Sequence, residues 1–566
     1  MVTISERKPK KIPGITSLFI SIDHYDKNIG DAISSLSEVY RYDKKTKEYE
    51  VPIKNVSQLL DKISEFDDIT LNSCIDEQHS YYNYVNKDSF KFKLFQHQVD
   101  AINYGCNKDK WLLLDDCGLG KTATAIYLAE ELYRQGKLEH CLIICGVDSL
   151  RTNWKKEIEK FTNLSCMILG DRVTRKGTTT YEGVAYRTEQ LKNKINEFFI
   201  ITTITTIRDD NIVEAFNNSV NKIDMIVLDE AHRMKGAAGK SKSKQGVNLL
   251  ELNAKYKLAM SGTLVVNNPV DMYAPLVWIG ETPKDSLTEF KKYYCEYNEK
   301  LDRYDGFKNL DVLKEQLNTC SLRRLKTEVL KDLPEKFIIP QFLDMSDKQL
   351  KFYNEVLDGE RQSVDKVSLS RNNLLGRIVR LRQATSCPQT LTSQEINSIK
   401  IDRCVEMVND LVGVRSEKLV IFSGFKDVVY DLANQLQQYR PIVLTGDTSN
   451  EDFDKGYFNF QNNENEKLLI ATYQKLGTGV NLNSARYLIF IDTPWTSSDF
   501  NQACDRVYRI GSNKTVFIYN LICNNTIDEK VWELVNYKQA LSDFLIDDKI
   551  VNESALQSLQ KYILDL

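Results

Sequence analysis

Several residue types are scarce in this chain of 566 residues, and each scarcity excludes a class of protein. It has five histidines and twelve cysteines without a Cys-x-x-Cys pair, so no zinc-ligand spacing is present. Cys141 and Cys145 lie inside an apolar run, which is typical of reduced core residues in a reducing cytosol. No apolar run approaches the roughly 18 residues of a spanning helix, and the N-terminus lacks the apolar core of a signal peptide. We therefore expect a soluble protein without zinc and without a membrane partner.

An excess of either charge is also missing. The 75 basic and 79 acidic residues give a net charge of −4. A protein that coats DNA passively is usually basic, whereas a motor needs only a local positive groove, so net charge neither supports nor excludes a nucleic-acid partner. Hydrophobic residues make up 42% and charged residues 27%, as in ordinary globular proteins. At about 150 residues per domain, the length predicts three or four domains.

Two stretches alternate short apolar runs with amphipathic segments. The first carries WLLLDD, CLIICG, FFIITTI and MIVLDEAH, and the second, after residue 400, carries KLVIFSG, PIVLTGD, KLLIATY and YLIFIDTPW. Continuous apolar strands that alternate with helices predict parallel sheets with helices on both faces. The stretch 282–400 reads as helices. We predict a small N-terminal α+β domain (1–88), a first α/β lobe with a helical insertion (89–335), a helical insertion and second lobe (336–545), and a C-terminal helical tail (546–566).

A phosphate-binding pattern follows the first apolar run. Trp111–Leu114 leads into DDCGLGKT (residues 115–122) and then into a helix. Glycines let backbone N–H groups curl around phosphate oxygens, and the helix N-terminus adds partial positive charge. Asp115 stands where the usual pattern has its first glycine, so on this pattern alone a chance match in a turn remains the alternative. The predicted nucleotide-binding residues are Asp116, Cys117, Gly118, Leu119, Gly120, Lys121, Thr122 and Ala123.

A second acidic pattern makes the chance match improbable. The apolar strand Met225–Leu228 ends in Asp229-Glu230-Ala231-His232. A carboxylate at a strand end holds magnesium, and its neighbour orients the attacking water. We assign Asp229 and Thr122 to Mg²⁺, Glu230 to the water and Lys121 to the β- and γ-phosphates of ATP.

In its motif order, the chain resembles the Swi/Snf-type DNA translocases of helicase superfamily two over roughly residues 90–540. That family writes its phosphate loop D-E-M-G-L-G-K-T, which accounts for Asp115. Leu94–Gln98 is similar to its Q motif, which implies that Gln98 contacts adenine. Ser149–Trp154 matches a segment that lies along a DNA strand, and Met260–Thr263 resembles motif III, although Leu264 replaces the usual proline. The resemblance implies two RecA-like lobes.

Later motifs distinguish this family from RNA helicases that also carry DEAH. Leu322–Lys326 followed by Leu333–Lys336 is similar to the family's R-R-x-K…L-P-x-K crossing between lobes. Leu381-Arg382-Gln383 with Cys387-Pro388 resembles its L-R-Q…H-P helix, with cysteine in place of histidine. For each motif alone, the alternative is charged helix surface.

The second lobe supplies the last predicted catalytic residues. Gly477–Leu482 looks like motif V, with Gly479 as a nucleotide contact, and Asp492–Trp495 looks like the strand end after it. Gln502–Gly511 is close to motif VI, which makes Gln502, Arg506 and Arg509 catalytic. Guanidinium groups stabilise the charge that spreads over the γ-phosphoryl oxygens. Arg506 and Arg509 are three apart, so on a helix they would share a face. Since Lys121 lies on the other lobe, hydrolysis is expected to require closure.

The N-terminal region predicts a β-hairpin. Glu38–Pro52 reads as a strand, a turn at Asp43–Thr46 and a second strand, with a helix-like segment at Val56–Ile63. The pattern is similar to the HARP domain of the annealing-helicase branch, which recognises junctions of single- and double-stranded DNA. That branch also favours aspartate at position 505. The alternative is a generic hairpin adaptor. Lys235, Lys240, Lys242 and Lys244 follow the DEAH sequence, where DNA contact and a merely solvated loop are equally consistent.

These observations favour a DNA-dependent ATPase that moves on double-stranded DNA and remodels or anneals branched DNA. Its cofactors would be ATP and Mg²⁺, and its partners double-stranded or branched DNA with replication or recombination proteins. The alternatives are a strand-separating helicase, the motor of a restriction or defence system, and a nucleic-acid scaffold that does not hydrolyse ATP. We expect a monomer in the cytoplasm of a bacterial or phage-infected cell, or in the nucleus if the source is eukaryotic.

Overall fold

The structure is a computed structural model in which the chain divides into two compact units. The first unit holds residues 1–114, 121–265 and 269–323, and the second holds residues 115–120, 266–268 and 324–566. The structure describes residues 2–7, 17–22, 33, 41–43, 48–52, 69–72, 90–146, 150–174, 177–234, 237, 243–262, 269–298, 303–330, 333–364, 371–475, 480–509, 512 and 514–546.

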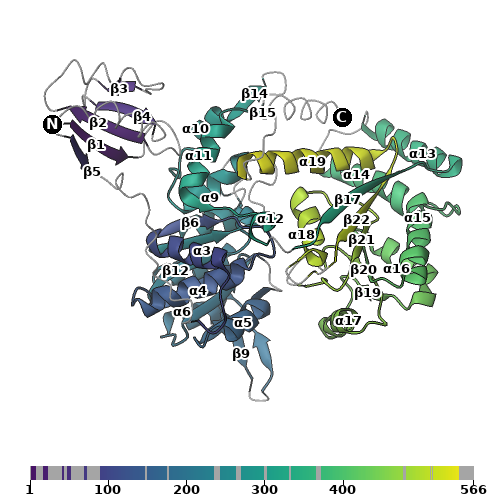
Figure 1. The fold of residues 1–566 in the computed structure, drawn as a ribbon, viewed down its shortest axis with the longest axis horizontal. Helices are drawn as coiled ribbons and strands as arrows, with labels where there is room; N and C mark the ends of the chain where they lie inside the picture. Colours follow the sequence, from purple (N-terminus) through teal and green to yellow (C-terminus); the bar gives the residue numbers. More distant parts are fainter. Residues whose placement is uncertain are drawn as a thin grey trace. The chain divides into compact units, whose positions relative to one another are not determined.

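A seven-stranded sheet forms the centre of the first unit (Figure 1). Its strand order is β16-β6-β13-β12-β7-β11-β8, and all of its pairs are parallel. The strands are β6 (Lys110–Leu113), β7 (His140–Cys145), β8 (Cys166–Ile168), β11 (Phe199–Thr203), β12 (Ile223–Leu228), β13 (Tyr256–Met260) and β16 (Ser321–Leu322). Their apolar runs are buried on both faces, as parallel sheets require. The predicted sheet of the first lobe is confirmed.

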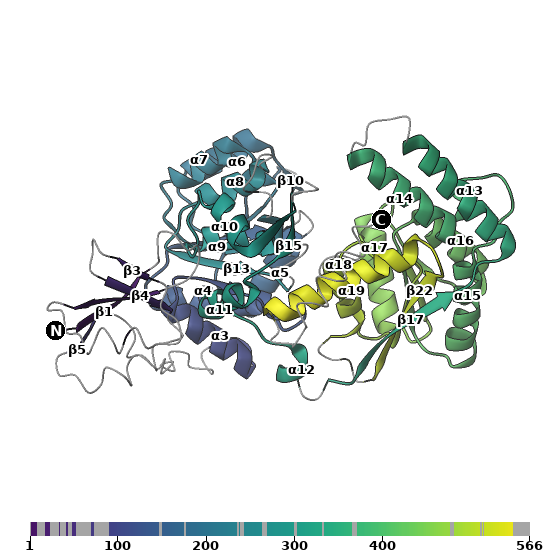
Figure 2. The same ribbon diagram turned by 90° about the horizontal axis from the view of Figure 1, so that it is seen from above.

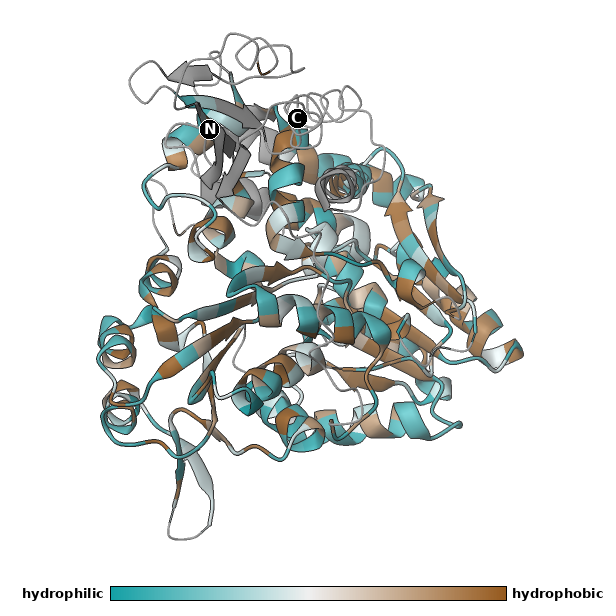
Figure 3. Ribbon diagram, turned by 60° about the vertical axis from the view of Figure 1, so that its left-hand side comes forward, coloured by the Kyte–Doolittle hydropathy of each residue, from teal (hydrophilic) through white to brown (hydrophobic). Residues whose placement is uncertain are grey.

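Helices cover this sheet and complete its core. Figure 3 shows the hydrophobic colour concentrated on the strands and on one stripe of the helices. The helix α3 packs against α4, and α4 packs against α5. The helices are α3 (Gln96–Asn107), α4 (Lys121–Arg134), α5 (Leu150–Phe161), α6 (Val184–Lys192), α7 (Asp210–Asn217), α8 (Lys244–Glu251), α9 (Tyr273–Trp278), α10 (Leu287–Tyr294) and α11 (Leu310–Cys320).

The expectation that the stretch 282–400 is helical is only partly correct. Two strands, β14 (Cys295–Asn298) and β15 (Arg303–Phe307), pair antiparallel in the first unit. In the second unit, β17 (Lys336–Leu343) is a strand of the central sheet. In β14 and β15 aromatic residues stand between polar ones, and β17 is rich in aromatic and β-branched residues, so both regions favour strands over helices. The rest of the described stretch is mainly helical.

The second unit contains a six-stranded parallel sheet in the order β17-β22-β21-β18-β20-β19. Its further strands are β18 (Leu419–Ser423), β19 (Ile442–Leu444), β20 (Leu468–Thr472), β21 (Tyr487–Phe490) and β22 (Val516–Cys523). Its helices, labelled in Figures 1 and 2, are α12 (Lys326–Val329), α13 (Asp347–Val364), α14 (Arg371–Ser386), α15 (Ile399–Val408), α16 (Lys426–Gln435), α17 (Asn450–Asn462), α18 (Ser497–Val507) and α19 (Ile527–Ile546). The chain therefore has two RecA-like lobes, as predicted.

A separate five-stranded sheet lies in residues 1–72. Its order is β3-β4-β2-β1-β5, with β1 (Val2–Arg7), β2 (Ser17–Ile22), β3 (Arg41–Asp43), β4 (Glu48–Pro52) and β5 (Ile69–Asn72). Strands β3 and β4 pair antiparallel, with Tyr42 opposite Tyr49, so the two strands of the predicted hairpin are confirmed. The segment Val56–Ile63 lies outside the described residues, and the domain boundaries stay a prediction. Across the described helices, none combines the length and the apolar composition that crossing a bilayer requires.

Candidate active site

The predicted catalytic segments of the first unit follow the carboxyl ends of neighbouring strands. The DEAH sequence follows β12, Ser261 follows β13, and the phosphate loop, which belongs to the second unit, continues the chain after β6. Backbone hydrogen bonds to neighbouring strands hold the first two segments at the edge of the sheet. The Asp229 N–H donates to the Ile144 carbonyl at 3.0 Å, and the Ser261 N–H donates to the Leu113 carbonyl at 3.1 Å. Ligands of open parallel sheets bind beyond the carboxyl ends of the strands. The first sheet therefore places the DEAH sequence and Ser261 together, although they are far apart in the sequence.

The phosphate loop turns sharply at its two glycines. Gly118 and Gly120 have φ angles of 90° and 81°, in the region that side chains strongly disfavour. Lys121 is the first residue of α4, so the loop ends at a helix N-terminus. Lys121 and Thr122 are half-buried, whereas Leu119 and Ala123 are buried in the core. Lys121 and Thr122 can therefore offer side chains to a nucleotide, while Leu119 and Ala123 can offer only backbone N–H groups.

Asp229 is held in place by two donors. Trp154 Nε1 donates to its Oδ2 at 3.0 Å, and the backbone N–H of Glu230 donates to its Oδ1 at 3.0 Å. Burial and the charge of Glu230 raise the pKa of Asp229 to about 6, against the opposing effects of Trp154 and Lys121. Trp154 was expected in a segment that lies along DNA, but its indole is buried and holds this carboxylate. The sequence match could not show the role of Trp154, since it depends on a long-range contact.

Glu230 adopts a left-handed backbone conformation, with a φ angle of 55°. Such strain in a non-glycine residue clusters at functional sites. Gly146 leaves the space for it, because a Cβ there would lie 2.8 Å from the Cβ of Glu230. His232 Nδ1 lies 3.2 Å from a carboxylate oxygen of Glu230 and 3.3 Å from Ser261 Oγ. Burial alone would raise the pKa of Glu230, but His232, Lys121 and Arg233 outweigh it and lower this pKa.

Gln98 makes a local contact in addition to any role with a nucleotide. Its Oε1 accepts a hydrogen bond from the backbone N–H of Phe95 at 3.1 Å, which caps the first turn of α3. The side chain is buried. Its contact with adenine stays a prediction.

Asp115 and Arg324 form a pair inside the second unit. Arg324 Nε donates to Asp115 Oδ1 at 2.9 Å, and Nη2 donates to Oδ2 at 2.5 Å. Asp116 Oδ2 accepts from the backbone N–H of Lys326 at 3.0 Å. The ammonium of Lys326 is buried and bonds the Asp505 carboxylate. The R-R-x-K segment thus holds the start of the phosphate loop, which explains why an aspartate replaces the usual glycine at Asp115.

The motif VI residues lie in and just beyond α18. Gln502 and Arg506 are half-buried in this helix, and Arg506 Nη1 donates to the carbonyl of Val480 at 3.4 Å. The expectation that Arg506 and Arg509 share a helix face is wrong, because α18 ends at Val507. Ser512 stabilises that ending: its Oγ accepts from the Arg509 N–H at 3.1 Å and donates to the Val507 carbonyl at 3.0 Å. Gly479 lies outside the described residues.

Arg382 of the L-R-Q helix is buried against the end of β21. Its Nη2 lies 3.2 Å from an oxygen of Asp492 and donates to the Thr493 carbonyl, and its guanidinium carbon lies 4.3 Å from the centre of the Trp495 ring. Asp492 is fully buried and also accepts from the Gly424 N–H at 2.9 Å. Arg382 therefore fixes the segment that leads into α18, rather than forming charged helix surface.

Of the four lysines that follow the DEAH sequence, the structure describes Lys244. Lys244 forms an exposed ion pair with Asp210 at 3.0 Å. Lys235, Lys240 and Lys242 lie outside the described residues, as do Ser149 and Thr263. Whether this loop contacts DNA stays a prediction.

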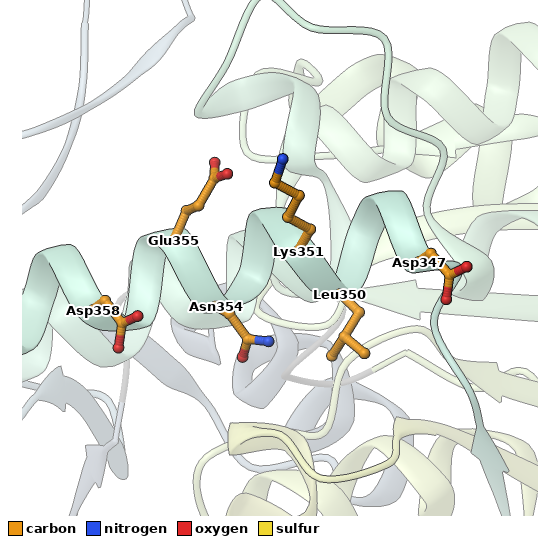
Figure 4. A pocket seen from close by; sticks show the side chains of 6 residues that line it. All are labelled: Asp347, Leu350, Lys351, Asn354, Glu355 and Asp358. Carbon is orange, nitrogen blue, oxygen red and sulfur yellow. The ribbon is translucent and has the colours of Figure 1, made fainter.

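An open depression along α13 in the second unit does not fit a nucleotide. It is lined by Asp347, Leu350, Lys351, Asn354, Glu355 and Asp358, all from this one helix. Figure 4 shows Lys351 and Glu355 pointing one way and Leu350 and Asn354 the other, so these side chains do not converge. Three carboxylates against one ammonium would also repel phosphate.

Comparison with known families identifies the class of protein. The model of the SNF2-related domain matches residues 95–390, which is more than half of the chain. The model of the helicase conserved C-terminal domain matches residues 400–511. The chain belongs to the SNF2-related family, and the predicted resemblance to Swi/Snf-type proteins is confirmed.

Individual relatives agree with this assignment. An uncharacterized ATP-dependent helicase of Mycoplasma pneumoniae is 25% identical over 89% of this chain and 48% of its own length. The DNA annealing helicase and endonuclease ZRANB3 of Bos taurus is 25% identical over 80% of this chain and 40% of its own. The putative ATP-dependent helicase/translocase YwqA of Bacillus subtilis is 26% identical over 84% and 51%. The chain thus spans about half the length of these relatives. The Sulfolobus solfataricus SWI2/SNF2 ATPase core in complex with dsDNA is 24% identical, covers 84% of this chain and 97% of its own, and has a TM-score of 0.38.

Proposed function

We propose that this chain is a DNA-dependent ATPase that moves on double-stranded DNA and remodels or anneals branched DNA. One observation carries the ATPase part of the proposal. The positive charge of Lys121, at the end of the phosphate loop, favours the ionised form of both Asp229 and Glu230, although burial and Glu230 raise the pKa of Asp229 overall, so the three groups act on one another at one edge of the first sheet. A lysine for the phosphates, a carboxylate for the metal and a carboxylate for the water are the parts that phosphoryl transfer to water needs.

The donor set at this edge fits magnesium. Mg²⁺ prefers oxygen ligands and is bound by one or two protein groups together with substrate phosphates. Thr122 offers a hydroxyl and Asp229 a carboxylate, whose burial beside Glu230 disfavours its charged form and raises its pKa. A divalent cation there would stabilise that charge. When bound, the ion would neutralise charge on the ATP phosphates.

Glu230 is suited to hold the attacking water. Its lowered pKa keeps the carboxylate ionised, so it accepts hydrogen bonds at neutral pH. His232 contacts both Glu230 and Ser261, so it restricts the position of the carboxylate. We infer that Ser261 and His232 orient Glu230 toward the γ-phosphate. Arg506 and Arg509 of the second lobe would then stabilise the transition-state charge.

Family membership and the relatives' names support DNA as the activator. One relative is named a DNA annealing helicase and another a helicase/translocase. The DNA would be held chiefly by its phosphates, which position a protein without reading base sequence. Strand separation, the first alternative, needs a structural element that no sequence motif identifies.

ATP hydrolysis measured with different nucleic acids tests the proposal. Duplex and forked DNA should stimulate ATP hydrolysis by the purified chain more strongly than single-stranded DNA or RNA does. Lys121→Ala in the same preparation gives the background rate of contaminating ATPases. Equal stimulation by RNA, or no stimulation by any DNA, would contradict the proposal. A strand-displacement assay on the same forks separates annealing from unwinding.

A further inference from the structure

A two-stranded ribbon extends from the first unit next to α5 (Figure 1). It consists of β9 (Asp171–Val173) and β10 (Thr179–Tyr181), paired antiparallel with Thr180 opposite Arg172. The three residues of β10 and the end of β9 are exposed, with Val173 at 72%. An isolated two-stranded ribbon is marginally stable, and this one buries little apolar surface of its own. It therefore needs support at its base, and it contributes little to the core.

The support comes from Tyr181, the last residue of the ribbon. Its hydroxyl lies 3.4 Å from Thr206 Oγ1, and Arg187 donates to the same Oγ1 at 3.1 Å. The guanidinium carbon of Arg187 lies 4.1 Å from the centre of the Tyr181 ring. Gly170, with a φ angle of 101°, lets the ribbon start here, because a Cβ would lie 2.8 Å from Arg187 Nε. Arg187 and Thr206 thus fix the position of the tyrosine ring.

The same ring holds a residue of the predicted DNA-binding segment. The guanidinium carbon of Arg151, in the first turn of α5, lies 3.5 Å from the centre of Tyr181. Such a cation–π contact fixes the position of the guanidinium group. Tyr181 therefore connects the ribbon to the α5 segment that the sequence predicts along a DNA strand.

The charge around this connection is positive. Arg151, Lys155, Arg172 and Arg187 lie near this connection, and the carboxylates of Asp171 and Glu182 oppose them. Arg151 and Lys155 lie close enough to Asp171 to lower its pKa, although burial raises that pKa more. Thr179, exposed on β10, adds a hydroxyl of the kind that binds phosphate oxygens, whereas the hydroxyls of Thr178 and Thr180 are hydrogen-bonded to Thr174 and Glu182. Since the chain as a whole is slightly acidic, this is a local surface for a polyanion.

We propose that the β9–β10 ribbon is a second contact of the first lobe with the phosphate backbone of duplex DNA, and that Tyr181 positions Arg151 for this contact. The inference rests on the proposed function and names a part of its DNA-binding surface. Arg172 on the ribbon contacts the backbone directly. Tyr181 acts through Arg151 and is a positioning residue.

The test measures affinity for a short blunt duplex against salt concentration, using the full chain. Each phosphate contact contributes about 0.9 to the slope of log affinity against log salt. Arg172→Ala should weaken binding several-fold and reduce the slope by about one. The control is Lys222→Ala, because Lys222 is 65% exposed and lies just before the amino end of β12, away from the edge that holds the site. It should leave both quantities unchanged.

The positioning role has its own comparison. Tyr181→Phe loses only the 3.4 Å hydroxyl contact with Thr206 and keeps the ring contacts with both guanidinium groups, so it should bind nearly as the wild type does. Tyr181→Ala should lose affinity and slope at least as strongly as Arg172→Ala. In ATPase assays, Tyr181→Ala should raise the DNA concentration for half-maximal stimulation several-fold, with the rate at saturating DNA within about two-fold of wild type. Equal binding by Tyr181→Ala and wild type would overturn this role.

Further outcomes separate the two proposals. If the Arg172→Ala protein has the affinity and salt slope of the wild type, the ribbon does not contact DNA. The proposed function would still stand in that case, provided that duplex DNA stimulates ATP hydrolysis by the wild-type chain. If Arg172→Ala changes the affinity for single-stranded RNA but not for duplex DNA, duplex is the wrong occupant. A wild-type chain that no DNA stimulates contradicts the proposed function, yet the duplex-binding slopes still decide on the ribbon.

Discussion

Arg324 holds Asp115 through two hydrogen bonds, across 209 residues of sequence. The carboxylate is 1% exposed and the guanidinium 17%. Removing one partner of a buried pair leaves an uncompensated charge, which costs about 3–5 kcal/mol. We expect Arg324→Ala to lower the free energy of unfolding by about 3 kcal/mol and Asp115→Asn by less, with the double variant about 1–3 kcal/mol short of the sum. Urea unfolding of the four proteins measures this coupling.

The exposed pair Arg403–Glu406 serves as the control for that cycle. Its side chains are 40% and 68% exposed, so its coupling should stay below about 1 kcal/mol. Strict additivity at Asp115 and Arg324 would mean that the pair does not stabilise the phosphate loop.

A second prediction concerns the space behind Glu230. A Cβ at Gly146 would lie 2.8 Å from the Cβ of Glu230, so Gly146→Ala should displace this carboxylate. Turnover should fall to below about a tenth of wild type, as in Glu230→Gln, while ATP binding persists, since Lys121 is untouched. Fluorescent-nucleotide binding and steady-state hydrolysis distinguish the two effects. Gly183→Ala, where a Cβ meets nothing within 4 Å, should behave as wild type. A fully active Gly146→Ala protein would show that the position of Glu230 is not limiting.

Arg506 and Arg509 should contribute to turnover and not to ground-state binding. A cationic group that acts in the transition state is worth about 10³–10⁵ in rate in related hydrolases. We therefore expect Arg506→Ala and Arg509→Ala to bind ATP normally and to lose about 10³-fold in hydrolysis. Because Arg509 lies beyond the end of α18, its position depends on Ser512, so Ser512→Ala should impair hydrolysis less severely. Equal losses of binding and hydrolysis would identify a ground-state contact.

Lys257 gives a prediction on pH. Its ammonium donates to the Leu252 carbonyl at 2.8 Å, and burial, with a smaller effect of Lys110, lowers its pKa to about 8. Between about pH 8 and the pKa of the unfolded chain, the unfolded state binds more protons, so the folded state gains stability as pH rises. The gain is at most about 1.4 kcal/mol per pH unit. The melting temperature of wild type minus that of Lys257→Met should therefore increase from pH 7.5 to 9.5. A constant difference would mean that Lys257 titrates normally.

The structural features that could be predicted from the sequence are those that depend on neighbouring residues in the chain. Buried parallel strands appear as continuous apolar runs, so both sheets and the segments after β6 and β12 could be placed. It did not predict Trp154 on Asp229 or Arg382 on Asp492, because these contacts join residues 75 and 110 positions apart. It also missed the end of α18 at Val507, since Ser512 Oγ stabilises that end from outside the helix. The three-residue spacing predicted that Arg506 and Arg509 share a helix face, but the helix ends before Arg509.

The N-terminal sheet leads to the last prediction, on the choice of DNA substrate. Strands β3 and β4 form the antiparallel pair that the HARP-like pattern predicted, with Tyr42 opposite Tyr49. If this hairpin holds the motor at junctions, deleting residues 1–88 should leave stimulation by long linear duplex largely intact, because the lobes bind DNA mainly through phosphates. Stimulation by forks should fall sharply, and annealing of forked DNA should fail. Rates are to be compared at matched salt, because phosphate contacts make affinity steeply salt-dependent. Deleting residues 1–88 could also destabilise the first lobe, so Tyr49→Ser in the full chain serves as a second variant. It should also lower the ratio of fork to duplex stimulation. If both variants keep the wild-type ratio of fork to duplex stimulation, the hairpin is a generic adaptor and junction preference belongs to the lobes.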